Sequence, residues 1–205
     1  MLAGCAVQDA PEQPAVQLQQ EQIIKQNMTG ETPGGESMKV LFIIAQNNFR
    51  DEELSVPKGI IEKAGYDVEV ASLTTGTAAG MLGAKVKPDL AVKEVDTNKY
   101  EYVVVVGGSG SALLAQDPDV IKVVSNAKNV GGICLGSMTL AKAGVLYGKK
   151  ATGFNTSELV NAMDEGGATY TGEEITVDGT TVTASGPKAA ERFGRKIVEV
   201  LEEER

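Results

Sequence analysis

The segment Val130–Leu140, VGGICLGSMTL, places a thiol where the backbone pattern changes. An apolar run typical of a buried strand ends at Cys134, and helix-forming residues follow directly after Leu135. A strand that turns at once into a helix forms a sharp elbow, which points its side chain over the sheet edge where open α/β folds bind ligands. We therefore expect Cys134 to be displayed rather than buried. The alternative is a small side chain that fills the tip of a core strand.

The position of Cys134 just before a helix also predicts its reactivity. Unpaired backbone N–H groups and the positive end of the helix dipole surround such a residue, and both stabilise a thiolate. They predict a pKa for Cys134 well below the usual value of about 8.5. The sequence thus favours a nucleophilic role for this cysteine.

The chain contains no histidine, which narrows the chemistry that it can perform. Ser-His-Asp and Cys-His pairs, imidazole acid–base catalysis and imidazole metal sites are all excluded. The two cysteines, Cys5 and Cys134, are far apart, so a disulfide framework or a cysteine-rich zinc site is excluded as well. We expect no bound metal.

A carboxyl group is the natural proton carrier in a chain without imidazole. The acidic triplet Asp51–Glu53, in NNFRDEELSVP, follows the first apolar run and should lie at the same sheet edge as Cys134. Such a triplet usually marks a solvated helix start. A carboxyl turned inward beside a thiolate would instead have a raised pKa and could act as an acid or a base.

A glycine-rich turn, GGSGSAL, follows the strongest apolar run, YEYVVVV. Its backbone N–H groups would suit an oxyanion at the sheet edge. The alternative is that the glycines only permit a tight turn. The third glycine of a dinucleotide-binding fingerprint would fall at Leu113, so we expect no dinucleotide and no other cofactor.

The elements that would position these groups alternate between strand and helix. Strand-like runs occupy 39–45, 67–73, 100–108, 130–134 and 149–154, and helical patterns occupy 53–66, 118–126, 136–144, 156–167 and 188–202. The segment 174–185 reads as a β-hairpin that turns at Asp178-Gly179. This alternation predicts an α/β fold with a doubly wound, mostly parallel sheet and helices on both faces.

Composition divides the chain into two parts. Residues 1–38 are rich in Gln, Glu, Pro and Gly and read as a disordered tether, whereas residues 39–205 should form one folded domain. The net charge of −9 opposes binding to nucleic acid or to an anionic membrane surface, because phosphates would be repelled. Small or neutral partners fit better.

The start of the chain, MLAGC, contains a match to a bacterial lipobox, in which small residues precede a cysteine that becomes lipidated. No charged and apolar signal region precedes it here. We expect that Cys5 is the first residue of a mature lipoprotein, anchored by its lipid to the membrane outside the cytoplasm. The alternative is a chance match in a cytoplasmic tail.

Taken together, several segments resemble the ThiJ/PfpI superfamily, which includes the parkinsonism-associated deglycase and the PfpI-type intracellular proteases. They are KVLFIIA, EELSVP, AGYDVEVAS, YEYVVVVGG, GGICLGSMTLAKAGVLYGKKAT and DGTTVTASGPKAAERFGRKIVEVL, and they span residues 39–201. The resemblance implies a flavodoxin-like sandwich, commonly a homodimer, with a reactive cysteine at the elbow.

The resemblance also assigns two catalytic residues. The elbow nucleophile corresponds to Cys134, and the family glutamate, four positions before a proline, corresponds to Glu53 ahead of Pro57. Glu52 would then lie at the surface. The pair of Cys134 and Glu53 is the catalytic unit that the resemblance supports.

Other site residues follow in the same way. Gly107 and Gly108 correspond to the glycines that line the oxyanion pocket, and the N–H group of Leu135 can also donate. PfpI-type proteases carry a histidine at the position of Leu135, and deglycase-type members often carry one where this chain has Phe154. Phe154 is therefore a candidate substrate-binding residue, and peptidase activity is not expected.

These observations lead to three hypotheses. The first is a glyoxalase- or deglycase-like enzyme in which the Cys134 thiolate attacks a small reactive aldehyde and Glu53 carries the proton. The second is a non-enzymatic redox or stress sensor that is oxidised at Cys134. The third is a binding domain with an inert cysteine, displayed on a surface tether.

Overall fold

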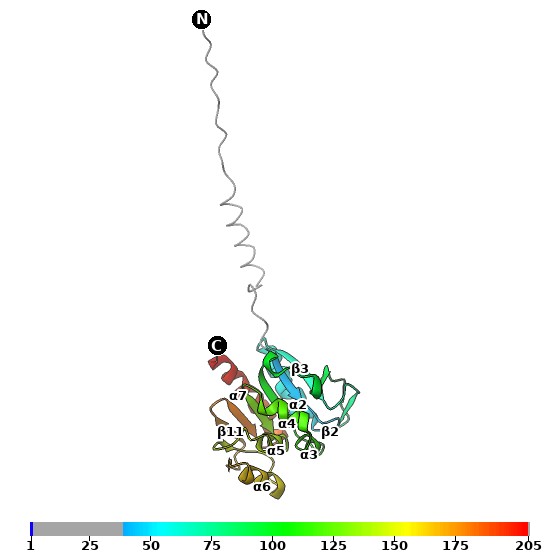
Figure 1. The fold of residues 1–205 in the computed structure, drawn as a ribbon, viewed down its shortest axis with the longest axis vertical. Coiled ribbons are helices and arrows are strands. Elements are labelled where there is room, and N and C mark those ends of the chain that lie inside the picture. The colour runs from blue at the N-terminus through cyan, green and yellow to red at the C-terminus, as the bar shows by residue number, and fades with distance from the viewer. Residues whose placement is uncertain (2–38, 205) are drawn as a thin grey trace. The chain divides into compact units, whose positions relative to one another are not determined.

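The computed structural model describes residues 1 and 39–204, and Figure 1 labels their elements. The remainder of the predicted tether, including the lipidation candidate Cys5, lies outside the described residues. The first described strand, β1, begins at Lys39.

A seven-stranded sheet forms the centre of the domain, in the order β11-β12-β8-β7-β1-β3-β6. All neighbouring strands are parallel except β11 and β12, which form the predicted hairpin. The strands are β1 (Lys39–Ile43), β3 (Asp67–Ser72), β6 (Leu90–Ala91), β7 (Tyr100–Val105), β8 (Val130–Ile133), β11 (Ile175–Asp178) and β12 (Thr181–Ala184). The continuous apolar runs of β1 and β7 are buried because these strands lie in the middle of the sheet and are covered on both faces.

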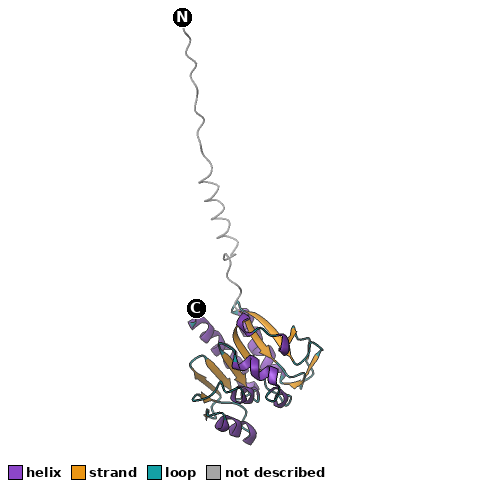
Figure 2. Ribbon diagram, viewed as in Figure 1, coloured by secondary structure: helices purple, strands orange, loops and turns teal. Residues whose placement is uncertain are grey.

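Helices cover both faces of this sheet, as the alternating pattern predicted (Figure 2). The main helices are α2 (Asp51–Lys63), α3 (Ser111–Leu114), α4 (Pro118–Ser125), α5 (Gly136–Lys142), α6 (Ser157–Glu165) and α7 (Ala190–Glu203). Helix α2 packs against α7, and α5 packs against α3, α4 and α6. After β1 the chain crosses to β3, toward one edge of the sheet, whereas after β7 it crosses to β8, toward the other edge. Because such crossovers are right-handed, the two helix groups lie on opposite faces of the sheet.

The ends of the helices follow from their sequence. The Asp117 side chain accepts hydrogen bonds from the first turn of α4, where Pro118 occupies the first position. Gly65 and Gly144 take positive φ values of 91° and 77° just after α2 and α5, which only glycine adopts without strain. Short 3₁₀ turns at Val92–Glu94, Thr97–Lys99 and Pro187–Ala189 complete the chain.

Two small sheets lie beside the central one. Strands β2 (Asn47–Phe49), β4 (Ala78–Gly80) and β5 (Lys85–Val86) form one, and β9 (Lys150–Ala151) and β10 (Thr169–Tyr170) form the other. The sequence predicted a strand at β9 but none at β2, β4 or β5. Residues 81–84 form the connector between β4 and β5. The Asp51 carboxylate holds this connector because it accepts the N–H groups of Leu82 at 2.9 Å and Ala84 at 2.8 Å.

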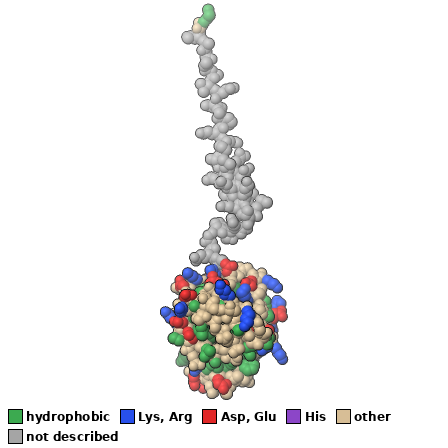
Figure 3. Space-filling view, turned by 90° about the vertical axis from the view of Figure 1, so that its right-hand side faces the viewer, with side chains coloured by type: hydrophobic (Ala, Val, Ile, Leu, Met, Phe, Trp, Pro, Cys, Tyr) green, Lys and Arg blue, Asp and Glu red, His purple; other side chains and the backbone are tan. Residues whose placement is uncertain are grey.

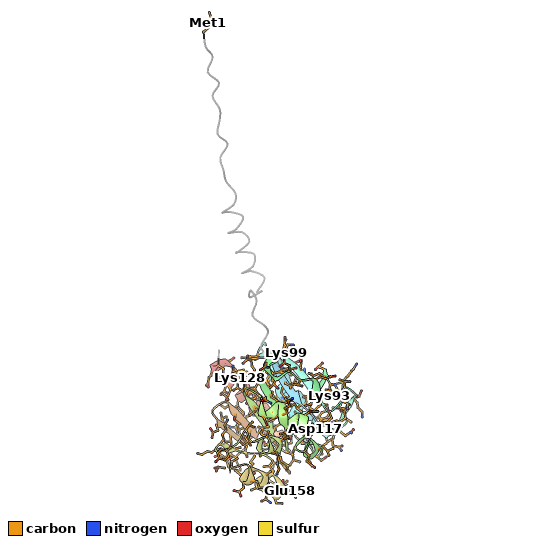
Figure 4. All side chains as sticks on the ribbon, viewed as in Figure 1. Met1, Lys93, Lys99, Asp117, Lys128 and Glu158 are labelled. Atoms are coloured by element: carbon orange, nitrogen blue, oxygen red, sulfur yellow. The ribbon has the colours of Figure 1, made fainter. Side chains whose placement is uncertain are left out.

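Because the strands are parallel, their amino ends lie at one end of the domain and their carboxyl ends at the other. Lys99 and Lys128, which precede β7 and β8, lie at the end opposite to Glu158 (Figure 4). The carboxyl ends of β1, β7 and β8 therefore meet away from these lysines. On the face shown in Figure 3, basic and acidic side chains are interspersed. Within the described part of the chain, no helix is both long enough and apolar enough to span a bilayer.

Candidate active site

Cys134 lies in a strained elbow between β8 and α5. Its φ angle is 58°, a left-handed conformation that side chains other than glycine rarely adopt. The Cys134 N–H group donates to the carbonyl oxygen of Ala184 at 2.8 Å, which ties the elbow to β12. A Cβ atom at Gly136 would overlap the carbonyl oxygen of Val105, so the turn into α5 requires glycine there. The sequence correctly predicted this elbow.

The thiol itself is buried, which corrects the expectation that the elbow displays it. Only 8% of Cys134 is exposed, because the residue turns toward Glu53 and Gly107 inside the domain. The low pKa expected for Cys134 is also wrong. Burial, and then the charge of Glu53, raises the pKa of Cys134 to about 12. Hydrogen bonds from the N–H groups of Gly108 and Leu135 act in the opposite direction, and they would stabilise a thiolate once it forms.

Glu53, in the first turn of α2, is the acidic residue of the triplet that turns inward. It is fully buried, and its Oε2 accepts the N–H group of Gly107 at 3.0 Å. Burial raises the pKa of Glu53 to about 7, although hydrogen bonds with Cys134 and Gly107 lower it. Glu52 instead pairs with Arg50 near the surface, where its carboxylate accepts the Arg50 Nε–H at 2.8 Å.

The glycine turn after β7 makes the close approach of these groups possible. A Cβ atom at Gly107 would overlap Glu53 Oε2 and lie 2.6 Å from the Cβ of Cys134. Gly108 has a φ of 101°, and a Cβ atom there would lie 2.6 Å from the backbone nitrogen of Arg50. Because the only N–H group of Gly107 is donated to Glu53, the N–H groups of Gly108 and Leu135 are the ones directed at the sulfur.

The buried pair has the features of a proton-transfer site. Glu53 and Cys134 share a side-chain hydrogen bond, and burial disfavours the charged form of each group. The second carboxyl oxygen, Glu53 Oε1, is buried and meets no N–H or O–H donor among the described residues. A carboxyl group with a pKa near neutrality can take the thiol proton and return it to a substrate. Among residues 39–204, no three His, Cys, Asp or Glu side chains cluster in a way that could hold a metal ion.

Phe154 lies beside the elbow, on the segment after β9. Its N–H group donates to the carbonyl oxygen of Cys134 at 3.2 Å, and 49% of the residue is exposed. The structure thus brings all six predicted site residues of the folded domain to one region: Glu53, Gly107, Gly108, Cys134, Leu135 and Phe154.

Sequence reasoning missed a residue that supports the glycine turn after β7. Asn48 adopts a left-handed conformation with a φ of 59°, and its carbonyl oxygen accepts the N–H group of Gly110 at 3.1 Å. This bond joins β2 to the turn after Gly107. Asparagine is among the few residues other than glycine that tolerate such a conformation, so the pair Asn47-Asn48 after a buried strand was the available signal.

The fold and the elbow define a class of flavodoxin-like α/β proteins with a cysteine at the carboxyl edge of the sheet. Residues 38–200 match the model of the DJ-1/PfpI family, and the chain belongs to that family. An uncharacterized protein of Methanocaldococcus jannaschii is 38% identical over 80% of this chain and 82% of that protein. A deglycase of Pyrococcus horikoshii is 32% identical over 80% of this chain and 99% of its own.

Two further comparisons extend the range of relatives. A glutathione-independent glyoxalase of Caenorhabditis elegans is 26% identical over 79% of this chain and 88% of that protein. The crystal structure of a ThiJ/PfpI domain protein from Brachyspira murdochii superposes with a TM-score of 0.77 at 34% identity, covering 82% of this chain and 99% of the other. The flavodoxin-like fold that the sequence predicted is confirmed by this match.

Proposed function

We propose that this protein is a cysteine-dependent enzyme of the glyoxalase or deglycase type, which acts on small reactive aldehydes. The single observation that carries the proposal is the buried, hydrogen-bonded pair of Glu53 and Cys134. The names of the relatives from P. horikoshii and C. elegans agree with it, since one is a deglycase and the other a glyoxalase.

The first step uses both members of the pair. Glu53 takes the proton of the Cys134 thiol, and the sulfur electron pair forms a bond to the aldehyde carbon. The carbonyl π electrons move to oxygen, which then receives the proton from Glu53. The product is a neutral hemithioacetal, and Glu53 is again a carboxylate.

The second half of the reaction needs only a proton shuttle and water. For methylglyoxal, the carboxylate takes the proton from the former aldehyde carbon to give an enediolate, and Glu53 returns this proton to the neighbouring carbon. The hydroxyl proton moves from the first oxygen to the second, so the former aldehyde carbon becomes the carbonyl of a thioester and its neighbour carries the hydroxyl group. Water then cleaves the carbon–sulfur bond and regenerates the thiol. The sum is methylglyoxal plus one water giving lactate and a proton, with no external oxidant.

The backbone at the elbow supports the charged intermediates. The N–H groups of Gly108 and Leu135 are directed at the sulfur, so they offset part of the cost of forming a buried thiolate. Peptidase activity is not proposed, because no histidine is available to protonate an amine leaving group.

Turnover of methylglyoxal to lactate by the full chain tests the proposal. We expect Cys134→Ser to lower the turnover rate by at least roughly a hundredfold, since serine at this buried site lacks an activated nucleophile. The matched control is Cys5→Ser, which should leave the rate unchanged. Turnover that survives Cys134→Ser would refute the proposal. A chain that turns over no aldehyde but gains oxygen at Cys134 under mild peroxide would favour a redox sensor instead.

Two further predictions rest on the sequence and the family resemblance. We propose that the chain forms a homodimer, and that a lipid on Cys5 attaches it to a membrane outside the cytoplasm. Light scattering of the purified protein measures the first. Metabolic labelling with a fatty acid, compared between the natural chain and Cys5→Ser, measures the second.

A further inference from the structure

Phe154 is an exposed aromatic side chain that the backbone holds in place. Its N–H group donates to the carbonyl oxygen of Cys134 at 3.2 Å, and its own carbonyl oxygen accepts the N–H group of Thr156 at 2.8 Å. Both polar groups of its backbone are therefore engaged. The residue is 49% exposed even though hydrogen bonds hold its backbone in place.

The preceding residue confirms how tightly this segment is packed against the elbow. A Cβ atom at Gly153 would lie 2.9 Å from the carbonyl oxygen of Cys134 and 2.7 Å from Cδ1 of Leu159. The backbone before Phe154 thus contacts the elbow on one side and helix α6 on the other. No side chain larger than hydrogen fits there without a shift.

The Phe154 ring lies near the end of β12. A Cβ atom built on Gly186 would be 3.8 Å from Cδ2 of Phe154, so the ring lies close to this glycine. Gly186 comes two residues after Ala184, whose carbonyl oxygen accepts the Cys134 N–H group. The ring consequently stands where the elbow, the end of β12 and the segment after β9 meet.

We propose that Phe154 is an apolar recognition surface beside Cys134, which selects carbonyl substrates that carry an aromatic or bulky apolar group over their methyl counterparts. The inference deepens the proposed function and, as a statement about substrates, rests on it. Its physical basis is general: a half-exposed phenyl ring gains free energy when a second apolar group covers it. We expect a preference of about tenfold, which corresponds to about 1.4 kcal/mol.

The first test measures recognition without turnover. N-phenylmaleimide and N-methylmaleimide each add a thiolate to the same carbon–carbon double bond, so the pKa and nucleophilicity of Cys134 affect both rates equally. Peptide mass spectrometry measures the rate of each addition at Cys134. The ratio of the two rates, divided by the same ratio for N-acetylcysteine, reports the contact between the protein and the phenyl group. We expect about 10 for the full natural chain.

Variants then assign the preference to one side chain. Phe154→Ala should bring the normalised ratio close to 1, and Phe154→Leu should retain part of the preference because leucine keeps apolar area. The matched control is Tyr147→Ala, which removes an aromatic side chain that is 80% exposed in the turn after α5. Thermal unfolding of each variant shows that it is folded before its rates are compared.

Three results would overturn the inference. They are a normalised ratio near 1 in the natural chain, a ratio that Phe154→Ala leaves unchanged, and no reaction of Cys134 with either maleimide. In the last case Phe154 would lie beside a cysteine that small molecules cannot reach.

The substrate class is tested by kcat/KM for phenylglyoxal against methylglyoxal. A preference for phenylglyoxal that Phe154→Ala abolishes supports the inference in full. If neither aldehyde is turned over while the maleimide preference holds, the proposed function fails but recognition by Phe154 stands. If both aldehydes are turned over at similar kcat/KM, the proposed function stands and the inference about substrates is wrong.

Discussion

Glu53 and Cys134, one in the first turn of α2 and the other at the elbow after β8, share a hydrogen bond inside the domain. Since both groups are buried, the pair resists carrying two negative charges. Near neutral pH it loses one proton, and the remaining proton is shared between the carboxyl group and the sulfur. The chemistry of this protein depends on which atom holds that proton.

The pH dependence of Cys134 alkylation should therefore report the pair. We expect the rate to rise as the pH passes about 7, where Glu53 becomes able to accept the thiol proton, and then to level off. In Glu53→Gln the step near pH 7 should disappear, and the rate should instead rise about tenfold per pH unit toward the pKa of the thiol, which loss of the Glu53 charge lowers. Iodoacetamide labelling followed by peptide mass spectrometry measures both profiles.

The neighbouring acid provides the control for that experiment. Glu52→Gln removes a carboxylate that pairs with Arg50 near the surface, and its charge raises the pKa of Glu53 far less than burial does, so the step should remain and move only slightly to lower pH. If Glu53→Gln and the natural chain gave the same profile, proton sharing between Glu53 and Cys134 would be disproved.

The raised pKa of Glu53 also predicts how stability depends on pH. Below pH 4.5 the carboxyl group is protonated in both the folded and unfolded chain, and its stabilising contribution is complete. Between pH 4.5 and about 7 the unfolded chain releases the proton while the folded chain retains it, so this contribution is lost as the pH rises. Relative to the natural chain, Glu53→Gln should gain about 3 kcal/mol of unfolding free energy between pH 4.5 and 8.

Urea unfolding of both chains across this range of pH measures that difference. Glu52→Gln retains Glu53, so its unfolding free energy should fall with rising pH as it does in the natural chain. A difference between Glu53→Gln and the natural chain that stays constant with pH would mean that folding does not raise the pKa of Glu53.

Most of the fold could be predicted from local sequence patterns. The runs that became β1, β7 and β8 are apolar and short, and Asp117-Pro118 and Gly144 mark helix ends by capping chemistry that acts within a few residues. The small sheet of β2, β4 and β5 could not be predicted this way. It depends on the distant carboxylate of Asp51, which accepts hydrogen bonds from the connector.

The sequence predicted where the site lies in the fold, but it did not predict the burial of Cys134 or its raised pKa. The elbow pattern located Cys134 correctly, because a strand followed directly by a helix requires a sharp turn. Its burial, and the resulting rise in pKa, depend on Glu53 in α2 and on the turn at Gly107 after β7, which are distant from Cys134 in the sequence. The same holds for the Gly107 N–H group, expected to face an oxyanion but donated to Glu53.

Gly107→Ala should disrupt this arrangement directly. The added methyl group would overlap Glu53 Oε2 and lie 2.6 Å from the Cβ of Cys134 and 2.8 Å from the carbonyl oxygen of Ile133. We expect a loss of about 1–3 kcal/mol of unfolding free energy, as for other overpacked interiors, together with loss of Cys134 reactivity. Chemical denaturation and alkylation measure the two effects.

Helix α2 provides the matched control for that substitution. A Cβ atom at Gly59 meets no atom within 4 Å, so Gly59→Ala should stabilise the protein by about 0.5–1 kcal/mol through reduced backbone freedom in the unfolded chain. Equal effects of the two substitutions would show that the Gly107 backbone relaxes away from Glu53 and that close packing at this point is not required.

The strain at the elbow can be measured by removing the side chain in two ways. Cys134 has a φ of 58°, a conformation that glycine adopts freely and that costs other residues roughly 1–2 kcal/mol. Cys134→Ala and Cys134→Gly both delete the thiol and its hydrogen bond with Glu53, but only the glycine variant relieves the strain. We expect Cys134→Gly to be more stable than Cys134→Ala by about 1 kcal/mol in urea unfolding, after the greater freedom of glycine in the unfolded chain is deducted. The opposite order would mean that the elbow is held without strain.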